Sequence, residues 1–164
     1  MSFSSDIAKF VAKTNRRNNA IVRKLVIDMG TSLVMKTPVG NPELWEGFSE
    51  ARSSANNYHW LEKAGFFMEG YVGGAARANW QYGNLIMPES VVDAVDTNGT
   101  STINKIIGGV KASPAASIHW ISNNLPYIQR LEEGYSKKQA PQGMLRLTVT
   151  EFEQTVRDAI KNVN

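Results

Sequence analysis

Residues 1–36 carry the pattern that most constrains the fold: one amphipathic helix, longer than a compact domain of this size needs. Apolar residues recur there at steps of three and four, the period of a helix with one apolar face: Ile7, Phe10, Val11, Ile21, Val22, Leu25, Val26, Met29, Leu33 and Val34. Ser4 or Ser5 is expected to cap its start, with Asp6 near the positive end of the helix dipole. Pro38 is expected to end it. The stripe fades over 14–19, so part of the helix is expected to project.

The same segment concentrates the positive charge of the chain. Residues 1–36 hold seven Lys/Arg against two Asp, a net charge of +5, whereas the other 128 residues hold eleven against thirteen, a net charge of −2. Helical spacing places most of one basic group on one side of the helix: Lys9, Lys13, Arg16, Arg17 and Lys24. This side is a candidate contact for DNA or for an acidic partner protein. A solvated helix face is the simpler alternative.

Length and composition are those of one globular domain. The chain has 164 residues, 42% of them hydrophobic and 20% charged, so a single domain over 1–164 is expected. It contains no cysteine, and it lacks the continuous apolar run of a signal peptide or a membrane span. We therefore expect a soluble protein made in the cytoplasm, with no disulfide and no membrane partner.

The middle of the chain mixes irregular and well-patterned segments. Residues 43–69 contain several aromatic residues without a period and are expected to form an irregular insertion, which contacts a partner or packs over its own core. Alternating apolar residues predict strands within 78–88 and 116–124. A helix is expected over 100–111, from a Thr/Ser cap to the Gly108-Gly109 pair.

Two helices are expected near the carboxyl end. The first runs over 126–134, with Pro126 at its first position and Gly134 as its stop. The second carries one apolar stripe, made by Leu145, Val149, Phe152, Val156, Ile160 and Val163. The predicted fold class is α+β, with a small antiparallel or mixed sheet packed by the long N-terminal and C-terminal helices.

Side chains that could perform catalysis are few and scattered. Neither His59 nor His119 has His, Cys or carboxylate neighbours at metal-ligand spacing, so a structural role is expected for each. Glu132 and Glu133 are adjacent on a short helix and point about 100° apart, so they cannot address one substrate atom together. The Walker lysine and the dinucleotide glycine spacing are absent. We expect no cofactor, no metal and no enzymatic activity.

The segment ISNNLPYIQRLEEGYSKKQAPQGMLRLTV, residues 121–149, resembles the C-terminal signature of phage tail-completion, or head–tail joining, proteins. This group includes the minor tail proteins similar to the Z protein of lambda-like phages. Lys137-Lys138 stands where members often have a single Lys. Upstream, Thr37-Pro38-Val39 and GYVGGAARANWQ are similar to a second family pattern, in which Arg77 alone represents a basic pair. The matching signature residues are 123–127, Leu131, Glu132, Gly134, Ser136, Gln139, Ala140, Pro141, Gly143 and Met144.

The resemblance implies a structural virion protein in the neck or at the top of the tail. It implies a homo-oligomeric ring, with sixfold symmetry expected, between a tail terminator or tube protein and head-completion or connector proteins. A closed ring of heterologous contacts needs two different surfaces on each subunit. The signature would supply one of them as a subunit interface: Asn123, Asn124, Pro126, Tyr127, Arg130, Glu132, Tyr135, Ser136, Gln139 and Pro141. Core packing beneath the loop is the alternative for Tyr127, Leu131 and Met144.

Two other functions stay open from the sequence. A DNA-binding module would use the basic helix face to contact phosphates without reading the base sequence. A tail terminator protein belongs to the same structural class, and only the C-terminal signature separates it from a tail-completion protein.

Overall fold

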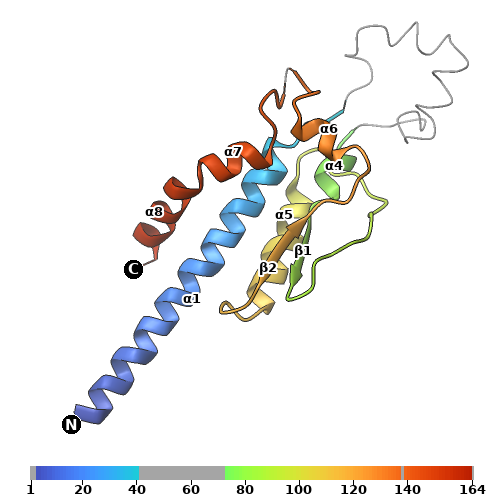
Figure 1. The fold of residues 1–164 in the computed structure, drawn as a ribbon. Coiled ribbons are helices and arrows are strands. Elements are labelled where there is room, and N and C mark those ends of the chain that lie inside the picture. Colours follow the sequence, from blue (N-terminus) through green and yellow to red (C-terminus); the bar gives the residue numbers. More distant parts are fainter. Residues whose placement is uncertain (1–2, 41–72, 138, 164) are drawn as a thin grey trace, which may run out of the picture.

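The computed structural model describes residues 3–40, 73–137 and 139–163. The predicted insertion at 43–69 lies outside these ranges. One long helix, α1 (Phe3–Lys36), forms the axis of the molecule, and a two-stranded sheet with helix α5 (Thr100–Ala112) packs against its C-terminal half (Figure 1). Two C-terminal helices run back along α1. The predicted α+β class is confirmed, and the sheet is antiparallel.

Helix α1 confirms the predicted long helix, with one difference at its start. The helix already includes Phe3, so Ser4 and Ser5 lie inside its first turn and do not cap it. Asp6 lies in that first turn, as expected. The helix ends at Lys36, where the Thr37 N–H still reaches the Leu33 carbonyl at 3.1 Å. The prediction that Pro38 ends the helix is correct.

The close approach of α1 to the rest of the body depends on Gly30. A Cβ atom at this position would lie 3.0 Å from a methyl group of Ile106 and 3.2 Å from one of Ile121. Leu33 and Val34 follow on the same buried part of the helix. The core is built around this contact and contains Leu33, Val34, Trp80, Ile106, Val110, Ala140 and Met144.

The two strands are shorter than predicted. β1 (Gln81–Asn84) and β2 (His119–Ser122) pair so that Gly83 faces Trp120 and Asn84 faces His119. Leu85 has a φ of 64°, a left-handed conformation that ends β1 before Pro88. The predicted alternation in β2 is correct, because Ile121 packs toward α1 while Trp120 stays 38% exposed on the other face.

The prediction that helix α5 ends at the Gly108-Gly109 pair is wrong. It continues to Ala112, and Gly99 with a φ of 80° precedes its first residue. The reason for Gly109 is packing, because a Cβ there would lie 2.4 Å from the ring of Tyr82. A short helix that was not predicted, α4 (Ala75–Ala78), precedes β1.

Helix α6 (Ile128–Glu132) begins two residues after Pro126, which is therefore not its first residue. The predicted stop at Gly134 is confirmed, and the last helical residue is Glu132. Gly134 has a φ of 85°, its N–H donates to the Leu131 carbonyl, and the Tyr135 N–H donates to the Arg130 carbonyl. These two bonds form a Schellman motif, which requires the left-handed conformation that glycine adopts most easily.

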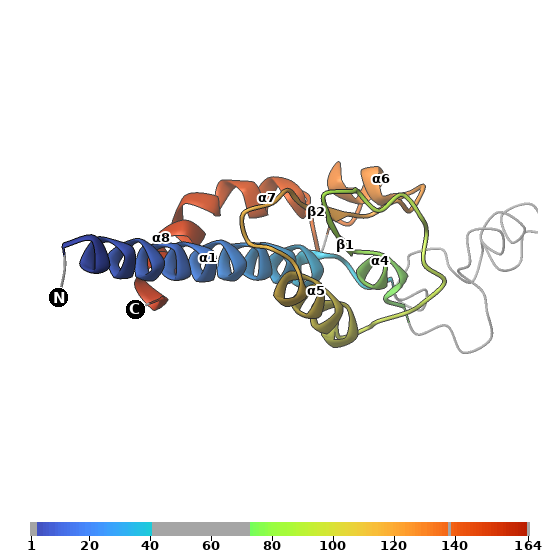
Figure 2. The same ribbon diagram turned by 90° about the horizontal axis from the view of Figure 1, so that it is seen from below.

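The C-terminal helix is broken into α7 (Leu145–Thr150) and α8 (Phe152–Asn162) at Glu151. The hydroxyls of Thr150 and Thr155 bond to the carbonyls of Arg146 and Glu151, four residues earlier, a contact that bends helices. Figures 1 and 2 show α8 beside α1 and antiparallel to it, with the first turns of α1 extending beyond.

The predicted apolar stripe of this helix does not face the core. Thr148 and Ala159 are the buried residues of α7 and α8, and the Ser32 hydroxyl bonds that of Thr148 at 3.1 Å. Small side chains on this face let the helices approach α1 closely. Four of the six predicted stripe residues are exposed instead: Leu145, Val149, Phe152 and Ile160.

Candidate interaction site

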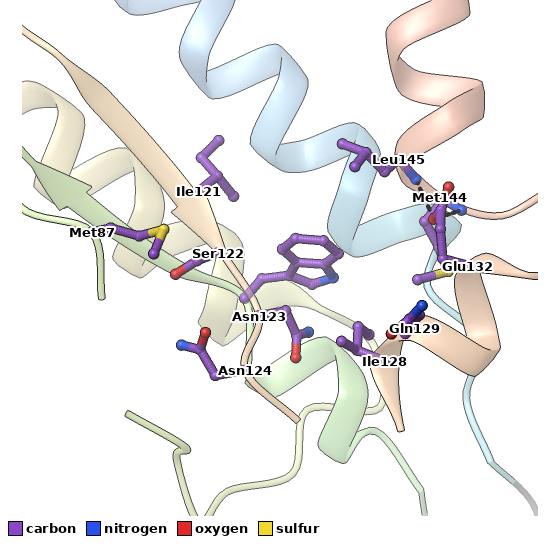
Figure 3. A pocket seen from close by; sticks show the side chains of 11 residues that line it. Met87, Ile121, Ser122, Asn123, Asn124, Ile128, Gln129, Glu132, Met144 and Leu145 are labelled. Atoms are coloured by element: carbon purple, nitrogen blue, oxygen red, sulfur yellow. Dashed lines mark hydrogen bonds between the residues drawn. The ribbon is translucent and has the colours of Figure 1, made fainter. Parts of the chain in front are cut away.

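A groove opens between β2, α6 and the start of α7, beside the signature segment (Figure 3). Its volume is about 390 Å³. Asn123, Asn124 and Glu132, three of the predicted interface residues, are among those that line it. The complete lining is Trp80, Met87, Ile121, Ser122, Asn123, Asn124, Ile128, Gln129, Glu132, Met144 and Leu145.

The most buried residues of the groove are Trp80 and Met144, which are 8% and 1% exposed. The Trp80 indole N–H donates to the Thr37 hydroxyl at 2.7 Å, and this hydroxyl donates to the Leu33 carbonyl. An indole has one polar hydrogen, and here it is satisfied inside the protein. The floor of the groove is therefore suited to an apolar side chain of a binding partner.

Glu132 at the end of α6 caps α7. Its carboxylate accepts the backbone N–H groups of Met144, Leu145 and Arg146 at 2.8 to 2.9 Å. The first N–H groups of a helix have no partner within the helix, and a negative charge there also meets the positive end of the helix dipole. Figure 3 shows Glu132 turned toward Met144 and Leu145. Glu132 therefore fixes the edge of the groove.

The two asparagines of the signature hold the strand end against distant segments. The Asn123 amide donates to the Ala76 carbonyl in α4 at 2.8 Å. The Asn124 amide donates to the carbonyls of Pro88 and Ser90 at 2.8 and 3.1 Å. Both amides therefore fix the loop after β1 and helix α4 beside the groove.

The other predicted interface residues do not line the groove. Pro126, Arg130, Tyr135 and Pro141 are exposed, Tyr135 to 72%. Tyr127 and Ser136 are half-buried. The Gln139 amide pairs with both backbone polar groups of Val39, just beyond α1. The contacts of these residues with another subunit stay a prediction.

The predicted basic face lies mainly on the first half of α1, away from the groove. Lys9, Lys13, Arg16 and Arg17 are exposed, whereas Lys24 pairs with Asp28 at 2.8 Å within the helix. We call residues 3–17 the arm. By helical spacing, Phe3, Ile7, Phe10 and Val11 share a second face of the arm, and they are 47 to 82% exposed.

Arg77 closes the other end of α1. Its guanidinium donates to the carbonyls of Met35 and Thr37, at the C-terminal end of the helix, and to that of Thr97. Helix C-termini leave carbonyls without a partner and carry partial negative charge, so a cation is favourable there. Burial lowers the pKa of Arg77, while the charge of Asp96 opposes this change. The upstream basic residue of the resemblance thus has an anchoring role.

Asp96, which sequence reasoning did not single out, caps α5. It accepts the N–H groups of Gly99 and Thr102 and the Thr102 hydroxyl at 2.7 to 3.0 Å. Burial disfavours its charge, but these hydrogen bonds and the charge of Arg77 outweigh burial, and the pKa of the Asp96 carboxyl lies below its usual value. The Asp before a Gly and a Ser/Thr run was the available signal for a helix start.

Of the two histidines, the structure describes His119, which is bonded within the chain. Both ring nitrogens of His119 are bonded, Nδ1 to the Tyr82 hydroxyl at 2.7 Å and Nε2 to the Ala115 carbonyl at 3.1 Å. Over 3–40, 73–137 and 139–163, no three His, Cys, Asp or Glu residues are grouped to hold a metal ion. Within those ranges, no helix is both long and apolar enough to cross a membrane. His59 lies outside them.

A second exposed apolar surface covers the outer side of the sheet. The loop after β1 folds back over Gly83, where a Cβ would lie 2.2 Å from the Ile86 carbonyl oxygen. Gln81, Ser122 and the buried Asn79 fix this loop through its backbone at Ser90, Pro88 and Val92. Seven apolar residues are exposed there, and we call them the loop patch: Leu85, Ile86, Met87, Val91, Val95, Ile118 and Trp120.

Comparison of the chain with protein-family models, with curated proteins and with solved structures finds no match.

Proposed function

We propose that the protein is a structural subunit of a tailed-phage virion, placed in the neck or at the top of the tail. Exposed apolar side chains on separate parts of the described chain carry the proposal: the arm, the loop patch and the outer face of α7 and α8. Monomeric soluble proteins rarely expose several contiguous apolar surfaces, which mark sites of protein–protein contact. The resemblance of segment 121–149 to tail-completion proteins supplies the kind of assembly.

The groove supports an assembly role rather than catalysis. Its floor is apolar, and the polar groups of Trp80, Asn123 and Glu132 are bonded within the chain. Binding sites for protein segments combine such an apolar centre with a polar rim, and the residues that dominate affinity usually lie near the centre. In this proposal, Tyr135 and Pro126, which are exposed, contact the neighbouring subunit.

The proposed assembly is a ring of identical subunits, sixfold by the resemblance. Its neighbours would be a tail terminator or tube protein on one side and head-completion or connector proteins on the other. Unlike apolar surfaces on one subunit are compatible with a heterologous contact, which forms a ring when the rotation between neighbours closes.

Mass spectrometry of purified virions, compared with tailless heads from the same phage, tests this proposal. The protein is expected in complete virions and absent from tailless heads, and immunogold labelling is expected at the head–tail junction. Absence from both particles, or turnover of a substrate by the purified protein, would contradict it.

DNA binding by the arm is a second candidate, favoured by the exposure of Lys13, Arg16 and Arg17 on a projecting helix. Contacts with phosphates make affinity fall steeply with salt. Titration of duplex DNA of unrelated sequences at two salt concentrations separates the two functions. The structural proposal expects weak binding by the isolated protein.

A further inference from the structure

We infer that the arm of one subunit docks on the loop patch of a second copy of the same chain. The inference rests on the proposed function and deepens it, because it names the two surfaces that meet. Apart from Met87, which also lines the groove, it concerns neither the groove nor the signature residues. Its basis is that the arm and the loop patch are opposite in charge and similar in apolar character.

The arm offers an apolar stripe beside a basic side. Phe3 and Phe10 are 82% and 70% exposed. Among residues 3–17 there are four Lys/Arg and one Asp, a net charge of +3. Helical spacing sets Lys13 and Arg17 one turn apart, next to the stripe. A partner of this face must combine exposed apolar side chains with negative charge next to them.

The loop patch has these properties. Within residues 85–95 the charged residues are Glu89 and Asp93, both exposed, and no Lys or Arg occurs there. In the extended part of the loop, Val91, Asp93 and Val95 are exposed while Val92 and Ala94 are half-buried. The side chains that point outward along this part of the loop are therefore one acidic residue between two apolar residues.

The loop patch is a firmly held surface. The Leu85 N–H donates to the Ile118 carbonyl at 2.9 Å, and the Trp120 indole N–H donates to the Leu85 carbonyl at 3.3 Å. Asn79 is 1% exposed and bonds both backbone polar groups of Val92. The backbone that carries the exposed side chains is thus held without a ligand, and a partner does not have to order it.

The arm cannot reach the loop patch of its own subunit. It is the first part of a continuous helix of 34 residues, about 51 Å long at 1.5 Å per residue. Figures 1 and 2 place the N-terminus at one end of the molecule and the loop between β1 and α5 near the other. The contact must therefore join two copies, and because the surfaces differ, it is head-to-tail.

Cysteine cross-linking tests the contact, because the chain has no cysteine of its own. Phe10→Cys and Val91→Cys change exposed side chains, so both variants are expected to fold as the parent does, which circular dichroism checks. Mixed under mild oxidation, they are expected to form a covalent heterodimer. Asn104→Cys, on the exposed side of α5, is the matched control and is expected to cross-link with neither.

Each other result overturns the inference. Dimers of Phe10→Cys alone, at the yield of the mixture, would show arm-to-arm pairing. Dimers of Val91→Cys alone at that yield would show contact between two loop patches. Absence of a heterodimer at any protein concentration, in solution and in assembled virions, would show that the occupant is another molecule, such as DNA or a different protein. The proposed function would stand if the protein were still found in virions.

Charge reversal gives an independent measurement by sedimentation velocity. The Lys13→Glu and Arg17→Glu double variant, and the Glu89→Lys and Asp93→Lys double variant, are each expected to weaken self-association about tenfold. An equimolar mixture of the two is expected to regain most of it through the reversed pair. If the mixture stays as weak as its components, the two surfaces do not meet.

Discussion

The two ends of α1 belong to one helix, but their apolar residues are buried at one end and exposed at the other. At its C-terminal end, Gly30, Leu33 and Val34 are buried within the body, and the guanidinium of Arg77 donates to the last carbonyls. In the arm, apolar residues of the same periodicity lie exposed. Helical periodicity therefore identifies a face that is suited to burial. It does not identify whether the surface that covers this face belongs to the same chain.

This difference has an energetic side. Isolated helices are marginal in water, and most helical stability in proteins comes from packing of an apolar face. The anchored end obtains that packing within the subunit. The arm obtains its stability from continuity with the anchored end and, under the inference above, from a neighbouring copy.

The largest expected contrast comes from the same substitution at the two ends. Val34→Ala removes buried methyl groups from a residue that is 0% exposed and is expected to lower the free energy of unfolding by about 2–3 kcal/mol. Val11→Ala, at 48% exposure, is expected to change it by less than about 0.5 kcal/mol. Urea unfolding measures both. Equal losses would mean that the arm is buried within the monomer.

Asp96 gives the next largest effect, together with a pH dependence. Asp96→Asn weakens three hydrogen bonds to a charged acceptor and is expected to cost about 2 kcal/mol at neutral pH. Asp93→Asn, exposed in the same loop, is the control with little change.

The sign of the pH effect follows from the lowered pKa of Asp96. The unfolded chain takes up a proton on this group first, so the parent protein loses this part of its stability as the pH falls below about 4 and through the lowered pKa. Asp96→Asn is expected to lack this component in unfolding curves measured at several pH values. A parallel acid loss in the variant would assign the effect to other carboxylates.

Glu132→Gln tests the cap of α7 with a smaller expected effect. In the parent protein, the two charged oxygens of Glu132 accept three backbone N–H groups. A neutral amide has only one acceptor oxygen, so the free energy of unfolding is expected to fall by about 1–2 kcal/mol. Glu133→Gln, exposed at the next position, serves as the control. Thermal unfolding of the three proteins checks this, and similar Tm values for all of them would show that the cap contributes nothing.

The smallest expected effect concerns the contact between Gln139 and Val39, just beyond α1. Gln139→Ala removes both hydrogen bonds to Val39 at an exposed site, and a cost of about 0.5–1 kcal/mol is expected. Gln142→Ala, also exposed in this loop, is expected to be neutral. Hydrogen exchange at Val39 reports the same contact locally: its amide should exchange faster in the first variant only.

Local sequence rules predicted the elements whose limits depend on nearby residues. Helix α1 followed its period to the turn before Pro38, and α6 ended at Gly134 because the left-handed conformation is needed there. The two faces of β2 followed from alternation. The α+β class followed from the order of these elements.

What the sequence did not predict depended on contacts with distant residues. Gly109 is required by the ring of Tyr82, so it marked close packing where a helix end was expected. Thr148 and Ala159, which are small, face α1, so the larger apolar residues of α7 and α8 point outward. The roles of Glu132 and Asn123 inside the chain depend on which backbone groups the fold brings to them.

A stiff rod fixed at one end transmits orientation as well as position. Gly30, Arg77 and Trp80 fix the C-terminal end of α1, and the helix is continuous back to Phe3. The angle between the body and any molecule that binds the arm is therefore determined by the helix. In a closed array of identical copies, that angle would determine how many members complete the circle. Inserting a single residue in the uncovered turns rotates the tip by about 100°, and so would alter the geometry of the array while leaving each member folded.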